Sequence, residues 1–274
     1  MEYMIENEVL RLTASDVGGE LRDLRRSGDP DQPLLWDGKP DIWPRRAPVC
    51  FPWCGKVEEG WFEDGGIRYE APQHGFVRDM EHTLIQRTAD SLTFRLEWPG
   101  DGNRWPWRFS FETRHALVGN TVETTCTAVN LDGRSMPVQL GFHTGLRCPF
   151  TAGRLLRDYV VRFDQPEAPG GGDRFLLDPH TFDDDSICLP GLRSAWLQVE
   201  EAGGNYLRVE TEGYPYVLLW STPGEPGFLC IEPWTGYTGP GHDLSARPGA
   251  ALLRPGETFA RTQRLTVGIH THLL

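Results

Sequence analysis

The chain has 274 residues, and its 27 Lys and Arg against 39 Asp and Glu give a formal net charge of −12. Polyphosphate and anionic lipid would repel so acidic a chain, so we expect neither nucleic acid nor a membrane among its partners. Hydrophobic residues make up 39% and aromatic residues 11%, which excludes a disordered chain and predicts a packed core. We therefore predict a single domain over residues 1–274, as a monomer or a homodimer.

The first ten residues carry Glu2, Glu6 and Glu8 and lack a basic segment followed by an apolar one, so they do not resemble a secretion signal. No apolar run approaches the roughly eighteen residues that a membrane-spanning helix needs. A cytoplasmic protein is the expectation that follows. The six cysteines are scattered through a chain too large to need a disulfide scaffold, so we predict free thiols, most of them buried.

Alternation of apolar and polar residues with a period of two recurs along the chain and is typical of half-buried strands. Strands are predicted, in chain order, within 3–12, around residue 21, and over 67–70, 91–98, 107–118, 122–128, 207–211, 216–220, 228–231 and 261–269. Gly119-Asn120 lies between two of them and predicts a tight hairpin turn.

Two stretches between the strands predict loops. Residues 164–173 contain two prolines and three successive glycines, and residues 178–185 are acidic and irregular. Helical periodicity is nearly absent, and 31 glycines with 22 prolines suit a chain of many short strands joined by turns. The predicted fold class is all-β, and the number of strands favours a large sandwich over a small barrel.

Three segments, 47–79, 140–150 and 228–237, place polar residues in apolar or Gly/Pro-rich surroundings. His74 precedes a glycine on a predicted loop, with Arg78 four residues later; His143 lies between aromatic positions; and Glu232 ends an apolar run, where a carboxylate is costly to bury without a partner or a purpose. Each has a structural alternative: a lone histidine is commonly a hydrogen-bonded structural residue, and Glu232 can cap a turn or pair with an arginine such as Arg78.

Other catalytic and metal motifs have little support. Cys50 and Cys54 form a C-x3-C pair without a second pair, so no structural zinc is predicted. The sequence has no G-x-S-x-G, no P-loop and no G-x-G-x-x-G between a strand and a helix, so serine hydrolases, nucleotide hydrolases and dinucleotide-dependent enzymes are not indicated.

Four short sequence segments, taken in their order along the chain, resemble those of a known family. They are 48–55 (PVCFPWCG), 74–79 (HGFVRD), 141–143 (GFH) with Cys148-Pro149, and 230–234 (CIEPW), and 253–257 (LRPGE) matches the turn before the last strand. Together they resemble the aldose 1-epimerase (galactose mutarotase-like) superfamily, in particular its LacX-like branch, from about residue 48 to the C-terminus.

The resemblance implies a large twisted antiparallel β-sandwich with a sugar cleft, and interconversion of the α and β anomers of free aldoses without a cofactor or metal. It places the base on Glu232 and the general acid on His143, with His74 beside the ring oxygen and Arg78 on the sugar hydroxyls. This pairing suits hemiacetal opening, which removes the C1 hydroxyl proton while the ring oxygen gains one.

The tryptophans Trp53 and Trp234 are predicted to offer apolar faces to the sugar ring, although bulky core filling is the alternative. Arg46, with Arg45 before it, precedes a piece similar to that of hexose-6-phosphate mutarotases, so a phosphosugar substrate remains an alternative.

Many members of the superfamily carry an aspartate shortly after E-P-W, and this chain has none until Asp243. A noncatalytic sugar-binding module of the same fold is therefore a second alternative. A third is a cupin-like metal enzyme using His74, His82 and His143, although the close H-x-H pair usual in such sites is missing among them.

Overall fold

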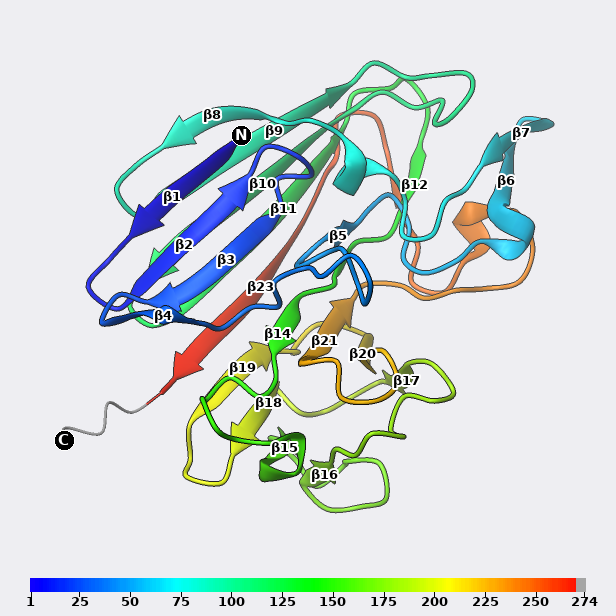
Figure 1. Ribbon diagram of the computed structural model, residues 1–274. Coiled ribbons are helices and arrows are strands. Elements are labelled where there is room, and N and C mark those ends of the chain that lie inside the picture. Colours follow the sequence, from blue (N-terminus) through cyan, green and yellow to red (C-terminus); the bar gives the residue numbers. More distant parts are fainter. Residues whose placement is uncertain (270–274) are drawn as a thin grey trace.

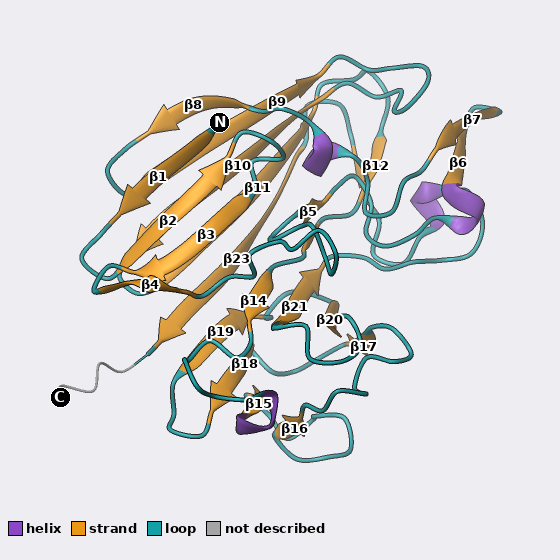
Figure 2. Ribbon diagram, viewed as in Figure 1, coloured by secondary structure: helices purple, strands orange, loops and turns teal. Residues whose placement is uncertain are grey.

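The computed structural model describes residues 1–269 and consists almost entirely of β-strands joined by loops and turns (Figures 1 and 2). This part of the chain forms 23 strands, and the last five residues of the predicted 1–274 domain lie outside it. Its helical turns are the short 3-10 helices η1 (Glu58–Gly60), η2 (Val77–Asp79), η3 (Leu156–Asp158) and η4 (Leu244–Ala246). The all-β prediction is confirmed.

The largest sheet has nine antiparallel strands, with a long hairpin near its centre. In spatial order they are β16 (Arg174–Leu176), β15 (Tyr159–Phe163), β18 (Trp196–Glu201), β19 (Tyr206–Glu210), β23 (Thr258–Gly268), β11 (Thr121–Asn130), β10 (Phe109–Val118), β9 (Ser91–Trp98) and β8 (Thr83–Arg87). Strands β10 and β11 pair along their whole length around the predicted turn. Burial alternates residue by residue along β11, so one face of this sheet contacts the core.

Smaller sheets complete the fold. The first four strands form one sheet: β1 (Glu2–Glu6), β2 (Leu10–Ser15), β3 (Leu21–Arg26) and β4 (Asp29–Pro33). A six-stranded sheet contains β17 (Ile187–Pro190), β20 (Tyr216–Trp220), β21 (Phe228–Trp234), β13 (Gly141–Phe142) and β5 (Val49–Cys50), with β14 (Gly145–Arg147) paired to β21. Two pairs are separate: β6 (Trp61–Asp64) with β7 (Ile67–Glu70), and β12 (Met136–Val138) with β22 (Ala251–Leu253).

The sheets pack as layers around a continuous core. In Figure 1 the β1–β4 sheet covers the half of the nine-stranded sheet that contains β9 to β11, while the β6–β7 hairpin projects from the body. One cluster of buried residues runs from Leu12 in the first sheet through Phe51 and Phe111 to Ile231 in the six-stranded sheet. Burying each such side chain contributes about 1.5–3 kcal/mol, so this cluster is the main source of stability.

The structure refines two of the strand predictions. Segment 3–12 contains two strands because Asn7 makes a turn, its Oδ1 accepting hydrogen bonds from the N–H groups of Val9 and Leu10. The strand predicted over 228–231 continues to Trp234, and all seven of its residues are buried. Burial on both faces removes the alternation that would have marked its end.

The loops predicted over 164–173 and 178–185 are irregular, apart from isolated bridges. All six cysteines are free thiols, five of them buried and Cys188 partly so, which confirms that prediction. Within residues 1–269, no helix is long and apolar enough to cross a membrane.

Candidate active site

One cavity of about 560 Å³ brings together residues from all three of the polar segments singled out in the sequence. Pockets that bind small molecules commonly measure about 300–1,000 Å³. The charged and imidazole side chains in its wall are Arg45, Lys56, His74, Arg78, His143, Asp185 and Glu232, and the aromatic ones are Trp43, Trp220, Trp234 and Tyr237. Of the five predicted site residues other than His143 and Glu232, three (His74, Arg78 and Trp234) line this cavity and two (Trp53 and Arg46) do not.

Strand β21 supplies the carboxylate because its two faces have different neighbours. Leu229 and Ile231 point to the main core cluster, whereas Glu232 and Trp234 line the cavity. The strand pairs with β20 on one side, where Glu232 lies opposite Leu218, and with β13 and β14 on the other. A central strand fixes the position of this side chain more firmly than a loop would.

Glu232 is 1% exposed, and within residues 1–269 its Oε2 has no hydrogen-bond partner. Burial raises the pKa of its carboxyl well above the ordinary value of 4.5, and the negative groups Cys50 and Asp185 raise it further. An unpartnered carboxylate oxygen in a cavity wall is positioned to accept a proton from a ligand.

His143 follows the short strand β13, and its backbone N–H donates to the carbonyl of Pro48 at 3.1 Å. Its ring stacks on Trp43, with centroids 5.0 Å apart and planes at 28°, and meets the edge of Trp220. Its Nε2 lies 3.5 Å from Oε2 of Glu232. The acid and base named by the family resemblance therefore share one cavity.

The His143 ring is 7% exposed, and its Nδ1 has no hydrogen-bond partner in the described chain. Burial lowers the pKa of its imidazole well below the ordinary 6.5, with further lowering from the positive charges of His74 and Arg78. The carboxyl pKa of Glu232 moves upward at the same time, so burial disfavours the charged form of both groups.

His74 is positioned by contacts that involve two glycines, Gly75 and Gly55. Gly75 has φ of +74°, and a Cβ there would lie 2.0 Å from the carbonyl oxygen of Phe51, so only glycine fits after the histidine. The N–H of Gly55 donates to His74 Nδ1 at 3.1 Å, which leaves the ring hydrogen of a neutral imidazole on Nε2. The ring lies edge-on to His143 at 5.2 Å between centroids.

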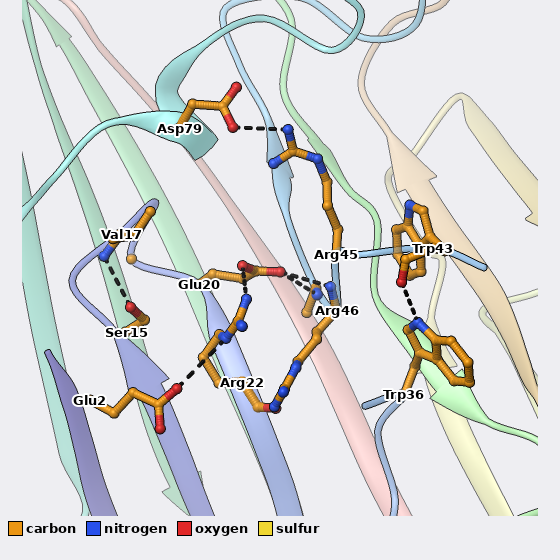
Figure 3. A network of polar contacts seen from close by, with 12 residues as sticks. Glu2, Ser15, Val17, Glu20, Arg22, Trp36, Trp43, Arg45, Arg46 and Asp79 are labelled. Atoms are coloured by element: carbon orange, nitrogen blue, oxygen red, sulfur yellow. Dashed lines mark hydrogen bonds and ion pairs between the residues drawn. The ribbon is translucent and has the colours of Figure 1, made fainter. Parts of the chain in front are cut away.

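Arg45, Arg46 and Arg78 point in different directions, and only two of them line the cavity. Arg78 lines the cavity, donates from Nη2 to the carbonyl of Gln73 at 2.6 Å, and has a buried Nε without a partner in residues 1–269. Arg45 also lines the cavity and pairs with Asp79 at 2.8 Å. Figure 3 shows Arg45 extending toward Asp79 while Arg46 extends the opposite way.

Arg46 does not line the cavity, unlike the sequence prediction, because its backbone and side chain are both held elsewhere. Its N–H donates to Oε1 of Glu20 at 2.9 Å, and its Nη1 donates to the carbonyl of Arg22 at 2.8 Å (Figure 3). The neighbouring Arg45 lines the cavity in its place.

Of the two tryptophans predicted to contact the sugar, one lines the cavity and the other does not. Trp234 lines the cavity, whereas Trp53 is 1% exposed and packs against Phe62 and Trp105, each 5.8 Å away between ring centroids. Its indole N–H donates to the carbonyl of Pro72, so the ring is a core residue and presents no face to the cavity.

The three histidines of the cupin-like alternative, His74, His82 and His143, do not all line one cavity. His82 is 2% exposed and lies outside the cavity wall, with Nε2 3.2 Å from the carbonyl of Val77. Burial lowers the pKa of His82 to about 4, as expected for a neutral structural histidine.

Comparisons with known proteins show which family the chain belongs to. The sequence model of the family described as aldose 1-epimerase matches residues 1–266. The chain belongs to this family. It is 28% identical to protein LacX (plasmid) of Lactococcus lactis subsp. lactis over 303 aligned positions, which cover 97% of this chain and 99% of that protein. The resemblance found in the sequence is confirmed.

Two solved structures are similar in fold to this aldose 1-epimerase family member. A galactose mutarotase related enzyme from Lactobacillus acidophilus has a TM-score of 0.90 and 26% identity, covering 99% of both chains. A galactose mutarotase-like protein from Lactobacillus casei ATCC 334 has a TM-score of 0.86 and 22% identity, covering 97% of this chain and all of that one. The predicted sandwich of the mutarotase-like kind is thereby confirmed.

The sequence of this aldose 1-epimerase family member did not predict several of the residues that line the cavity. Asp185 ends the acidic loop, has φ of +83° and lines the cavity, so the run 178–185 is more than a surface loop. Trp43 and Trp220, which flank His143, were not singled out either. The only local signal was the acidic run, because aromatic residues in β-proteins usually fill the core.

Proposed function

We propose that the protein is an aldose 1-epimerase that interconverts the α and β anomers of a free aldose by opening and reclosing the pyranose ring. The observation that carries the proposal is the pair of His143 and Glu232, 3.5 Å apart in the wall of one cavity, each with a buried polar atom that has no partner in the described chain. Opening a hemiacetal needs one proton acceptor and one donor at neighbouring oxygens of the same sugar.

The proposed reaction moves two protons and needs no external reactant. Glu232 takes the proton of the C1 hydroxyl while His143 gives a proton to the ring oxygen, and the C1–O5 bond breaks to leave an open-chain aldehyde. After rotation about C1–C2, the opposite face of the carbonyl is attacked by O5, and both protons return. Each residue thus acts once as acid and once as base.

These roles require His143 to carry a proton when the sugar is bound, with Glu232 ionised. Without a bound ligand, burial favours the neutral forms of both, as the directions of their pKa shifts indicate. Sugar hydroxyls donate hydrogen bonds to the carboxylate and lower the cost of its ionisation, so substrate binding itself prepares the base.

The remaining cavity residues position the sugar in this proposal. His74, with its ring hydrogen on Nε2, donates to an oxygen beside the reacting centre, and the guanidinium of Arg78 holds ring hydroxyls. The indoles of Trp43, Trp220 and Trp234, which all line the cavity, offer apolar surface to the C–H face of the ring.

Polarimetry of freshly dissolved α-glucose and α-galactose tests the proposal. We expect the wild-type protein to speed the decay of rotation, and Glu232→Gln, which keeps the shape of the side chain, to lose about a hundred- to ten-thousand-fold of the rate. Circular dichroism checks that the variant is folded. Sugar binding without any acceleration, on a panel of neutral and phosphorylated aldoses, would instead identify a noncatalytic sugar-binding module.

An aldose phosphate is the second candidate substrate, favoured by one observation. Three cationic side chains, Arg45, Lys56 and Arg78, line the cavity although the chain as a whole has a formal charge of −12. A local cluster of cations attracts phosphate more strongly than distant charges repel it. The ratio of kcat/KM for glucose 6-phosphate and glucose separates the two candidates.

A further inference from the structure

Three side chains able to bind a metal ion meet beside the cavity. A ring nitrogen of His143, Sγ of Cys230 and a carboxylate oxygen of Glu232 all lie within 4.8 Å of one another, and all three residues are buried. Within residues 1–269 they are the only such cluster of three. Imidazole, thiolate and carboxylate are the ligands that Zn²⁺ takes in proteins.

We propose that His143, Cys230 and Glu232 form a binding site for one thiophilic divalent cation, Zn²⁺ being the test case, and that the bound ion inhibits the enzyme. The binding rests on the donor geometry alone. The inhibition rests on the proposed epimerase reaction, because the ion would occupy its acid and its base together.

The spacing of the donors suits a tetrahedral ion. Zinc–ligand bonds of about 2.0–2.3 Å place neighbouring donor atoms roughly 3.3–3.7 Å apart. Nε2 of His143 and Oε2 of Glu232 are 3.5 Å apart, although Oε2 makes no hydrogen bond in the described chain. The two atoms therefore already have the separation of two ligands of one ion, and Sγ of Cys230 lies within 4.8 Å of the ligand atoms of both residues.

Cys230 lies where a third ligand is needed because of the strand period. It is two residues before Glu232 on β21, so both side chains project from the same face. Its thiol is fully buried, and it lies opposite Trp220, whose ring borders His143. Two cavity-lining ligands leave the fourth position of the ion facing the cavity, where water can bind.

The charges balance when the ion binds. Cys230 loses its thiol proton and Glu232 its carboxyl proton, both of which pass to solvent, while His143 stays neutral. One thiolate and one carboxylate then neutralise the two positive charges of the cation. A buried site without net charge avoids the large cost of placing an uncompensated ion in the protein interior.

Cobalt provides a spectroscopic test that does not depend on activity. Chelator-treated wild-type protein titrated with Co²⁺ is expected to bind one ion per chain, with a thiolate-to-cobalt charge-transfer band in the near ultraviolet that Zn²⁺ abolishes. Cys230→Ser should lose the band. Loss of an outer-shell partner alone costs about 10–100-fold in metal affinity, so loss of this ligand should weaken Zn²⁺ binding about a hundredfold or more.

A matched control and an activity assay complete the experiment. Cys126→Ser replaces another fully buried thiol, in β11, and should bind Co²⁺ as the wild type does. Zn²⁺ should stop anomer exchange by the wild type and a chelator restore it, while metal-free Cys230→Ser exchanges anomers at the wild-type rate. Cys230→Ala, compared by thermal unfolding, replaces the serine variant if that one fails to fold.

Absence of stoichiometric Co²⁺ binding, or equal binding by folded Cys230→Ser or Cys230→Ala, would overturn the proposed site. A zinc-loaded wild type that exchanges anomers at full rate would overturn the inhibition. A charge-transfer band in a wild type that never exchanges anomers would leave the metal site standing and end the proposed function.

Discussion

Two buried histidines in different parts of the molecule have opposite environments. His115 lies on β10 between the four-stranded and nine-stranded sheets and is 1% exposed. Its Nδ1 is 2.9 Å from Oγ1 of Thr124, and its Nε2 is 2.8 Å from the carbonyl of Gly19, so it connects the nine-stranded sheet to the loop between β2 and β3. Both ring nitrogens are satisfied by the protein.

His143 is nearly as buried, but one of its two ring nitrogens is not satisfied. Its Nδ1 has no partner in residues 1–269, and its Nε2 lies 3.5 Å from Oε2 of Glu232, while its ring stacks on Trp43. Burial therefore does not distinguish the candidate site from a structural contact. Polar atoms that the protein leaves unpaired in a cavity wall do, because a ligand can pair with them.

The largest expected effect separates these two histidines by activity. His143→Asn should lower the rate of anomer exchange about a hundred- to ten-thousand-fold and change the free energy of unfolding little, because it removes a proton donor without orphaning a protein partner. His115→Leu should keep the exchange rate and lose about 1–3 kcal/mol of unfolding free energy for each partner left unpaired. Polarimetry and urea unfolding on both variants measure the two quantities.

The opposite outcome for either histidine variant would contradict this distinction between a site residue and a structural residue. A His143→Asn protein with normal exchange, or a His115→Leu protein that is stable but inactive, would show that unpaired polar atoms do not mark the site.

A second effect, of intermediate size, concerns pH and stability. Burial lowers the pKa of His115 to about 4 from an ordinary 6.5. Between these values the unfolded state binds the proton and the folded state does not, so stability falls as pH falls from 6.5 toward 4. From pH 6.5 to 5 the loss from His115 is about 2 kcal/mol, and His82, with a pKa also lowered to about 4, acts in the same direction.

Urea unfolding at pH 7 and pH 5 measures this loss, and His115→Leu should reduce it by about the amount assigned to His115. A variant as sensitive to acid as the wild type would mean that other groups carry the pH dependence.

The smallest effect sharpens the same comparison at two neighbouring arginines. Arg45 lines the cavity and Arg46 is bound to backbone outside it. Arg45→Ala should raise KM about two- to tenfold with little change in kcat, as expected for the loss of one hydrogen bond to the substrate. Arg46→Ala should leave KM unchanged. Initial-rate kinetics decide, and equal KM values for the two variants would contradict the placement.

Much of the fold was predictable because half-buried strands have a regular pattern. Strand Ser91–Trp98 was predicted residue for residue, and the β10–β11 hairpin followed from its Gly-Asn turn. The end of β21 was missed because a strand buried on both faces has no alternation. Trp53 was placed in the site and Trp43 was not, since a sequence does not reveal whether an indole faces the core or a cavity.

The sequence by itself determined the all-β class, the family and the chemical types at the site, because strand period and short motifs are local properties of the chain. Only the tertiary structure decided that His143 and Glu232, far apart in the chain, lie 3.5 Å apart, and that Arg45 rather than Arg46 lines the cavity. It also brought Cys230 and Asp185 to the same region. These are contacts between strands and loops, and packing of the whole core sets their distances and the electrostatics that follow from them.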